Sequence, residues 1–537
     1  MSAISLPRAT QLPSPRGRRP WRGVRISLVA ACAVGCVAAA MIYRPWVNTP
    51  FDILDFSEFL PFLTRSDAFD QRFTDFVTYY ASQGRLNLLS YVFLIWKWSL
   101  FGWNEAAWQI ARFIQMQFIV VGVYLLLRAL GASGTGSAAG AALYIVAQTA
   151  TPAWIRLTMG EPLGVLAIIC ALLIATRYQE TSRWRSAGAA IAALLTASLL
   201  AKEMLLPLVP FVLLLACSRN RRGHFERPQR TRRNVWLVAL TTSGALAVLI
   251  PVAIVALGAG PGAYASAYAA GSISLGKFIY SLTVVVPPIS ASRVAAGSPV
   301  DYAANIVFFV VVAVSFRLAH RHNAFRLRWQ TLALGAMSVV LIGVLVYLPW
   351  PNFQDFYGLP YLLGPAILLA IAITAIEEAR PSWRWLVYAG CAIMLLQGAV
   401  YAAHEARAAI GARLVNGALV KEFVEHSSTD SIVVVMRRRM PAERAWQGRG
   451  RTLNRYARAI LPGRRIPAVY EASCSAASSI RNQGVGNAML VSYSTSCGTL
   501  PETSRTVRYD YFYLDWPTLV PRRDSLVVSI VGPEPGR

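Results

Sequence analysis

The chain has 537 residues, of which 55% are hydrophobic and only 15% are charged. Soluble globular proteins carry about 25% charged residues, so this composition excludes an ordinary soluble domain. The net charge of +26 does not indicate a nucleic-acid-binding protein, because the excess is arginine between long apolar segments, where it orients membrane helices.

Long apolar runs recur from residue 26 to residue 402 and then stop. Such runs predict membrane-spanning helices, and therefore an all-α polytopic membrane domain over residues 26–402, preceded by a basic arm at residues 1–25. We expect eleven crossings, at residues 26–43, 109–127, 136–152, 160–176, 187–201, 203–217, 235–258, 303–317, 330–349, 359–376 and 385–402.

Basic residues are dense in every second loop. The arginine-rich segments are residues 1–25, 177–185, 219–233, 317–328 and 380–384. With Arg128 they hold 23 basic residues, whereas the opposite loops, without the region after residue 402, hold nine. The excess predicts that the arginine-rich segments and the N-terminus are cytoplasmic, in a protein integral to the cytoplasmic (inner) membrane.

The apolar stretch at residues 86–101 would break this pattern if it crossed, because every later arginine-rich loop would change sides. It is short and contains Lys97, so we expect an amphipathic helix on the outer leaflet, within a first outer loop at residues 44–108. The first crossing also resembles a cleavable signal peptide near Cys36. Its apolar stretch continues through Ile42, which favours an uncleaved anchor.

The first outer loop is acidic and begins FDILDFSEFLPFL. Asp52, Asp55 and Glu58 are spaced by three residues, so a helix would place them along one face. One carboxylate could act as a general base while a divalent cation, Mg²⁺ or Mn²⁺, binds Asp52 and Glu58 and relieves their repulsion. The alternative is three solvated surface charges.

Further charges fall in later outer loops. Arg156 and Glu161 flank the outer end of one helix, and Lys202 and Glu203 form the turn of the hairpin SLLAKEMLLP. The arms of this hairpin are short, so the turn lies at or below the outer headgroups, where charges usually pair or line a site. A simple contact between Lys202 and Glu203, or with lipid headgroups, is the alternative.

The late outer loop YLPWPNFQDFYGLP carries Asp355 and Tyr357 at its tip, although its prolines and aromatics also suit an ordinary interfacial turn. The inner loops contain no GxxxxGK[ST], HExxH or dinucleotide-binding pattern, and the five histidines are scattered. The sequence therefore gives no sign of a nucleotide site or a zinc cluster.

Four segments resemble the GT-C superfamily of membrane glycosyltransferases, which use polyprenyl-phosphate sugars. YYASQGRLNLLSYVFLIWKWSLFGWNEAAWQIARF resembles the stretch after the first acidic residues of the family. RLTMGEPLGVL and SLLAKE resemble its later outer turns, and YLPWPNFQDFYGLPYLLGPA is a looser match to its late aromatic segment. The resemblance covers roughly residues 51–210 and the late segment, and does not extend to the C-terminal region.

The resemblance implies an inverting transfer of sugar from a polyprenyl-phosphate donor to a lipid, glycan or protein acceptor outside the membrane. Asp55 is favoured as the base. Asp52 stays open, because the family often has adjacent acidic residues whereas here they are three apart. The expected substrate-binding residues are Arg85, Arg156, Glu161, Lys202, Glu203, Asp355 and Tyr357.

Two other functions remain open, a polysaccharide polymerase or ligase and a lipid or glycan transporter without chemistry. A transporter predicts charges at mid-helix positions and pseudo-repeated halves, and the sequence shows neither.

From Arg407 the composition becomes that of a small α/β domain, expected outside the membrane over residues 403–537. A polar, helix-like stretch leads into three segments that predict buried strands, SIVVVM, NAMLVSYS and SLVVSIV. Cys474 and Cys497 would lie in an oxidising compartment, so we expect them to form a disulfide.

Overall fold

The computed structural model of the protein describes most of the helical region and five strands. The described residues are 35–37, 39, 53–147, 149–218, 227–258, 274–275, 278, 299–321, 327–348, 355–379, 381–400, 402–403, 406, 431–435, 468–472, 488–493, 505–515 and 520–531.

The first outer loop forms three helices, α2 (Ile53–Arg65), α3 (Phe69–Ser82) and α4 (Leu88–Phe101). The long apolar segments follow as α5 (Glu105–Leu130), α6 (Gly134–Val146), α8 (Glu161–Ala175), α9 (Trp184–Ala201), α10 (Val209–Ser218), α11 (Arg227–Gly258), α15 (Pro299–Arg321), α16 (Leu327–Tyr347), α17 (Leu363–Ala379) and a last helix within Pro381–Val400. Short helical turns connect them: α7 (Thr151–Ile155), η2 (Glu203–Leu208), η3 (Asp355–Leu362) and η4 (Pro381–Trp383).

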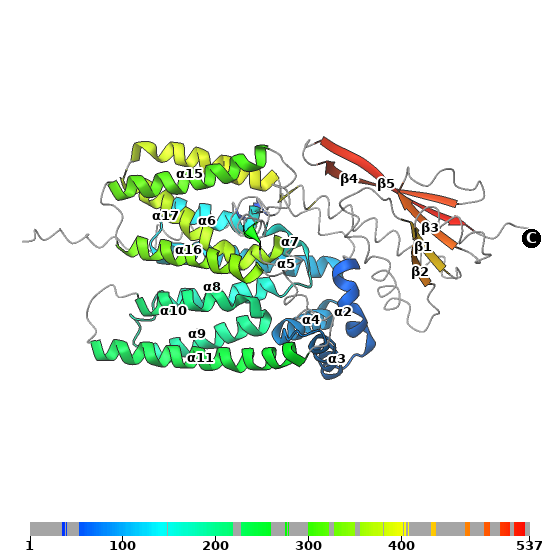
Figure 1. Ribbon diagram of the computed structural model, residues 1–537, viewed down its shortest axis with the longest axis horizontal. Helices are drawn as coiled ribbons and strands as arrows, with labels where there is room; N and C mark the ends of the chain where they lie inside the picture. The colour runs from blue at the N-terminus through cyan, green and yellow to red at the C-terminus, as the bar shows by residue number, and fades with distance from the viewer. Residues whose placement is uncertain are drawn as a thin grey trace, which may run out of the picture.

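The long helices lie side by side in a bundle, and α2, α3 and α4 gather at one end of it (Figure 1). We call this the acidic end, because Glu161 and Glu203 begin α8 and η2 there. At the opposite end, the basic end, α8 leads into α9 and α10 leads toward α11 through segments rich in arginine. The separation of acidic and basic turns matches the alternation of loops seen in the sequence.

Helix α17 is the core of the bundle, and every residue from Leu363 to Ile376 is buried. It packs against α6, α15 and α16. The contact with α6 is close because Gly136 and Gly140 face the backbone of α17, where a Cβ would lie 2.6–2.7 Å from the carbonyl oxygens of Ala370 and Ala366. Small residues allow this approach between helices that have no water to exclude.

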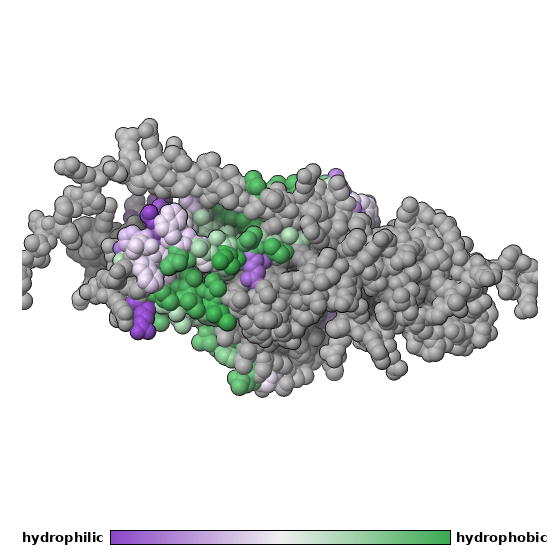
Figure 2. Space-filling view, turned by 90° about the horizontal axis from the view of Figure 1, so that it is seen from above, coloured by the Kyte–Doolittle hydropathy of each residue, from purple (hydrophilic) through white to green (hydrophobic). Residues whose placement is uncertain are grey.

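The outer surface of the bundle is apolar. Figure 2 shows a hydrophobic area between hydrophilic side chains on one face of the described surface. Large apolar side chains are exposed on α15 and on the last helix, among them Phe309, Val310, Trp385, Leu386 and Ile393. So many exposed apolar side chains on a soluble protein would cause aggregation, whereas in a bilayer they face lipid.

Within the described residues, five helices are long and apolar enough to cross a membrane, and six further apolar helices are shorter. Ten of the eleven predicted crossings coincide with these helices, and the first, at residues 26–43, lies almost wholly outside the described residues. The integral membrane character is therefore supported, whereas the count of eleven stays a prediction. Helix α4 has 14 residues and lies with α2 and α3 at one end of the bundle rather than among the long helices, as expected for a helix that does not cross.

The C-terminal region contains a five-stranded sheet of order β2-β1-β3-β5-β4. Its strands are β1 (Ser431–Val435), β2 (Ala468–Ala472), β3 (Ala488–Tyr493), β4 (Arg505–Asp515) and β5 (Val520–Val531). The strands β2, β1 and β3 pair in parallel, and β5 pairs antiparallel with both β3 and β4. The three predicted strands coincide with β1, β3 and β5. The helical part of the predicted α/β domain, Cys474 and Cys497 lie outside the described residues.

Candidate functional site

The centre of the acidic end is a buried ion pair between two turns. Helix α8 begins at Glu161, and α9 ends at Ala201, after which Lys202 adopts an extended conformation. The Lys202 ammonium nitrogen lies 3.1 Å from a carboxylate oxygen of Glu161, and the two side chains are only 12% and 5% exposed. The sequence predicted that Lys202 would pair or line a site, and the partner is Glu161 rather than the adjacent Glu203.

Helix α4 packs directly on these two turns. The Ser90 hydroxyl donates a hydrogen bond of 2.7 Å to the carbonyl oxygen of Ala201, next to Lys202. On the other turn, a Cβ added at Gly160 would lie 1.9 Å from the Ser90 hydroxyl oxygen. Only glycine permits this contact, so Gly160 is required for α4 to lie against the start of α8.

Tyr91 and Arg85 approach the same charges from α4 and from the residues before it. Tyr91 is 3% exposed, and its hydroxyl has no hydrogen-bond partner among the residues that the structure describes. Burial, and then the negative charge of Glu203, raise the pKa of Tyr91 against the opposing influence of the Asn87 backbone and of the Lys202 and Arg85 charges. One carboxylate oxygen of Glu203 is also buried, with no partner in the described part of the chain. These groups form a polar cluster within an apolar surround.

The late outer segment reaches this cluster through η3. The Tyr361 hydroxyl donates a hydrogen bond of 2.7 Å to the carbonyl oxygen of Met204, directly after Glu203. Its ring fits against Gly343, where a Cβ would lie 2.5 Å away. Asp355 and Tyr357 belong to the same helical turn, but their side chains lie outside what the structure describes.

The predicted acidic helix is present as α2. Glu58 is exposed on it, and the Tyr80 hydroxyl donates to its carboxylate at 3.4 Å. Asp55 lies one turn earlier in the same helix, although only its backbone is described, and Asp52 lies outside the described residues. The expectation that these carboxylates share one helix face therefore stays a prediction for Asp52.

A stack of aromatic rings connects α2 to the ion-pair region. The Tyr80 ring stacks on Tyr91 with 5.1 Å between centroids, and Phe76 stacks on Tyr91 at 5.6 Å. Phe59 of α2 lies 5.8 Å from Tyr80. Aromatic pairs of this kind are worth about 0.5–1.5 kcal/mol beyond their buried area, so the stack fixes the acidic helix over α4.

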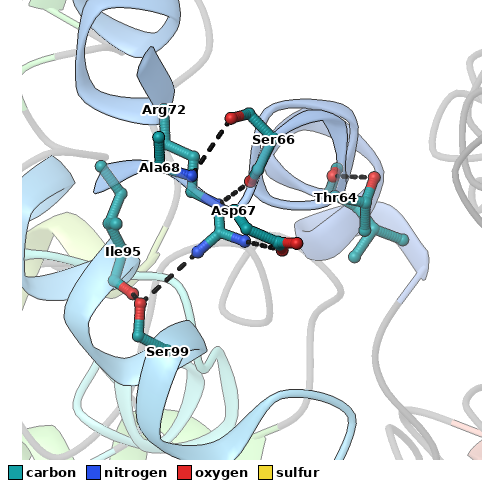
Figure 3. A network of polar contacts seen from close by, with 8 residues as sticks. Thr64, Ser66, Asp67, Ala68, Arg72, Ile95 and Ser99 are labelled. Atoms are coloured by element: carbon teal, nitrogen blue, oxygen red, sulfur yellow. Dashed lines mark hydrogen bonds and ion pairs between the residues drawn. The ribbon is translucent and has the colours of Figure 1, made fainter. Parts of the chain in front are cut away.

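Arg72 makes hydrogen bonds that join the same helices as the aromatic rings do (Figure 3). Its guanidinium donates to the carbonyl oxygen of Ser66, to the Ser99 hydroxyl at 3.4 Å and to the Asp67 carboxylate at 3.2 Å. The Arg72 side chain is 6% exposed, whereas that of Asp67 is fully exposed. Arg72 thus ties the turn between α2 and α3 to α4.

The structure brings together most of the predicted substrate-binding residues that it describes. Glu161, Lys202 and Glu203 meet at the two turns, with Arg85 close enough to act on them electrostatically. Arg156 ends α7 in the turn before Glu161 and is partly exposed. Tyr91, Tyr361 and Arg72 were not predicted. Their only signal in the sequence was a position among aromatic residues of the outer loops.

The predicted divalent cation has no ligand set among the described residues, where no group of three or more His, Cys, Asp or Glu side chains could hold a metal. Glu58 meets a tyrosine hydroxyl there rather than a second carboxylate. Asp52 and the Asp55 side chain are not described, so the expected pair of Asp52 and Glu58 stays a prediction, and no chemical step below uses a metal.

No protein-family model and no curated protein matches the chain. Several solved structures are similar to it. ArnT from Cupriavidus metallidurans in the apo state matches with 15% identity and a TM-score of 0.48, covering 96% of this chain and 99% of ArnT. ArnT bound to undecaprenyl phosphate matches with 14% identity and a TM-score of 0.44, covering 94% and 98%.

The arabinofuranosyltransferase AftD from Mycobacteria matches with 16% identity and a TM-score of 0.45, covering 95% of this chain but 40% of AftD. An oligosaccharyltransferase of Archaeoglobus fulgidus, in complex with Zn and sulfate, matches with 10% identity and a TM-score of 0.42, covering 87% and 67%. The neighbours thus include two glycosyl-transferring enzymes, the class implied by the GT-C resemblance. Similarity at this level does not assign the reaction of this chain.

Proposed function

We propose that this protein is a glycosyltransferase that moves a sugar from a polyprenyl-phosphate donor to an acceptor hydroxyl at the acidic end of the bundle. The observation that carries the proposal is the convergence of Arg85, Lys202 and Glu161 at the acidic end, to which the rings of Tyr80 and Tyr91 connect the helix that bears Asp55 and Glu58. Cations at the membrane surface suit a lipid phosphate, and a carboxylate helix beside them suits a base.

The acidic helix would supply the base. The Asp55 carboxylate takes the proton of the acceptor hydroxyl while the acceptor oxygen forms a bond to the anomeric carbon of the sugar. Attack opposite the leaving phosphate inverts that carbon. A positioned base of this kind contributes about 10²–10⁴ in rate. Asp52 is the alternative base, because the two aspartates are three residues apart in the sequence and the family resemblance does not decide between them.

The cations would serve the leaving group. The bond between the anomeric carbon and the phosphate oxygen breaks, and its electron pair leaves with the polyprenyl phosphate. Arg85 and Lys202 face the charge that gathers on the phosphate, and a site shielded from water makes such stabilisation stronger. Glu161 offsets the charge of Lys202 in its buried position, since a buried charge without a partner is expensive.

The proposal places the acidic end on the external face of the cytoplasmic membrane, where the donor would enter from the outer leaflet. Figure 1 shows the C-terminal sheet beyond this same end of the bundle. Reporter fusions after Arg233 and after Arg328 should therefore read cytoplasmic, and a fusion at Arg537 should read external.

The direct test uses the purified full-length protein in lipid nanodiscs with a panel of synthetic polyprenyl-phosphate sugars labelled in the sugar. Transfer should release polyprenyl phosphate and move the label to an added lipid, glycan or peptide acceptor. Movement of intact labelled donor across the bilayer of a proteoliposome, with no release of polyprenyl phosphate, would establish a transporter and overturn the proposal.

A further inference from the structure

Two buried cations meet at one peptide turn, next to the ion pair but outside it. The Lys97 ammonium of α4 donates to the carbonyl oxygen of Leu157 at 3.2 Å. The Arg112 guanidinium of α5 donates to the same oxygen at 2.8 Å and to the carbonyl oxygen of Met159 at 3.0 Å. Side chains from two helices therefore hold a single turn, residues 157–160.

Both cations are buried at a cost in free energy. Lys97 is 3% exposed and lies 4.2 Å above the ring of Trp108, and Arg112 is 2% exposed and donates to Gln115 at 2.9 Å. Burial, and then the Arg112 charge, lower the pKa of Lys97 well below its ordinary value. Packing alone would be served better by an apolar side chain, since a buried charge is expensive even when hydrogen-bonded.

The turn leads directly into the ion pair. Gly160 alone separates Met159 from Glu161, and Ser90 blocks the space that a side chain at Gly160 would need. Since Ser90 also bonds to Ala201, α4 fixes both the residue before Glu161 and the residue before Lys202. A shift of the turn would therefore move the Glu161 carboxylate away from the Lys202 ammonium.

We propose that Lys97 and Arg112 are positioning residues, which hold turn 157–160 and thereby set Glu161 against Lys202. They touch no reacting group and act through the two carbonyl oxygens. The inference rests on the proposed function only in treating Lys202 as part of the transfer site. Whether side chains of α4 and α5 hold Glu161 against Lys202 can be tested without any substrate.

The chain offers a clean probe, because it has only four lysines, Lys97, Lys202, Lys277 and Lys421. Acetylation by an N-hydroxysuccinimide ester requires an accessible neutral amine, so the ion pair should protect Lys202. The full-length protein in nanodiscs would be treated with the ester acetate, and the rate at each lysine would be followed by peptide mass spectrometry. Rates at Lys277 and Lys421 serve as internal references for the amount of active reagent in each sample.

In Arg112→Gln the turn loses its main donor, and the acetylation rate at Lys202 should rise roughly tenfold, equivalent to about 1.4 kcal/mol. Lys97→Met removes the second donor and should give a smaller rise. Arg112→Lys keeps a cation at the position and should restore part of the protection. Glu161→Gln removes the partner itself and sets the upper limit of the response.

The matched control is Arg128→Gln, at the other end of α5, where the side chain donates to the carbonyl oxygen of Ala132. It should leave the rate at Lys202 unchanged. Two results would overturn the inference: wild-type protection of Lys202 in both Arg112→Gln and Lys97→Met, or equal increases at Lys202, Lys277 and Lys421. If Arg112→Gln does not fold, the acetylation rate at Lys202 in Lys97→Met decides whether the inference holds. A protein that shows the expected rates but transfers no sugar would refute the proposed function and leave the positioning role intact.

Discussion

The two ends of the bundle hold buried charge in different ways. At the acidic end, Lys202 is neutralised by the carboxylate of Glu161. At the basic end, Arg233 of α11 donates at 3.2 Å to the carbonyl oxygens of Gln179 and Thr181, in the segment between α8 and α9. The acidic end thus adds a pair of full charges to the carbonyl contacts of Lys97 and Arg112, whereas Arg233 at the basic end is hydrogen-bonded to peptide carbonyls.

At the basic end, hydrogen bonds join the ends of neighbouring helices. The Tyr178 hydroxyl donates to the carbonyl oxygen of Arg233 at 2.9 Å, and the Gln179 amide donates to Ala216 at 2.9 Å and to Asn234 at 2.7 Å. Arg230 reaches the carbonyl oxygen of Cys217 at 2.9 Å, in the last turn of α10. Such carbonyls carry partial negative charge, so cations are stabilising there.

Buried polar atoms without partners within the described residues occur at both ends. They include the Tyr91 hydroxyl and one oxygen of Glu203 at the acidic end, and Nε of Arg128 and the Ser137 hydroxyl at the basic end. Native proteins satisfy almost all buried polar groups, and exceptions often mark functional sites. Within the described residues, the buried ion pair of Lys202 and Glu161 lies at the acidic end, so substitutions at the two ends should have different consequences.

The largest effect is expected on turnover at the acidic helix. Asp55→Asn keeps the shape of the side chain but cannot accept a proton, so transfer should fall by about 10²–10⁴ while the protein still folds. Glu58→Gln should lose less, because Glu58 is not the proposed base. Initial rates of label transfer would measure both. If Asp52→Asn abolishes transfer instead, the mechanism survives with Asp52 as the base, and full activity in both asparagine variants would remove the acidic helix from the mechanism.

The next largest effect is expected at the ion pair. Lys202→Met leaves the Glu161 carboxylate buried without its cation, which should lower the free energy of unfolding by about 3–5 kcal/mol. The double variant with Glu161→Gln removes both charges and should recover much of that stability. Thermal unfolding in detergent would show this, whereas transfer should stay impaired in both proteins. Equal melting temperatures for the single and double variants would contradict a coupled pair.

A smaller effect, on stability alone, is expected at the basic end. Arg233→Met removes the donor to Gln179 and Thr181 and should lower the free energy of unfolding by about 1.5–3 kcal/mol, the value of hydrogen bonds to a charged group. Turnover per folded molecule should be unchanged, because this residue lies at the far end of the bundle. A loss of turnover with normal thermal stability would show that the two ends are not separate in function.

The smallest effect is expected at Asp67, which pairs with Arg72 but is fully exposed. Exposed ion pairs contribute little, so Asp67→Asn should leave both thermal stability and transfer close to wild type. Asp70→Asn, in the first turn of α3, should be equally silent. Arg72→Gln is the informative contrast, since it also breaks the bonds to Ser66 and Ser99 and should reduce transfer by loosening α2.

Much of this architecture could be predicted from the sequence, because membrane helices and strands leave periodic and compositional signals along the chain. The apolar runs, the hairpin at Lys202, the short helix at residues 86–101 and strands β1, β3 and β5 all follow from local patterns. Strand β4 was missed because it is an edge strand with alternating polar and aromatic residues. Strand β2, at the other edge, was missed because AVYEA contains a charged residue and two alanines, whereas the equally short β1 is a continuous apolar run after its first residue.

Composition and charge by themselves determined the membrane character of the chain and which turns share an end of the bundle, because hydrophobic length and loop charge act locally. Tertiary structure alone decided the partners. Glu161, not the adjacent Glu203, neutralises Lys202, because α8 and α9 pack side by side and bring their ends together. The roles of Tyr91, Lys97 and Arg112 likewise depend on α4 lying across two turns that are far from it in sequence, and no local pattern records such a contact.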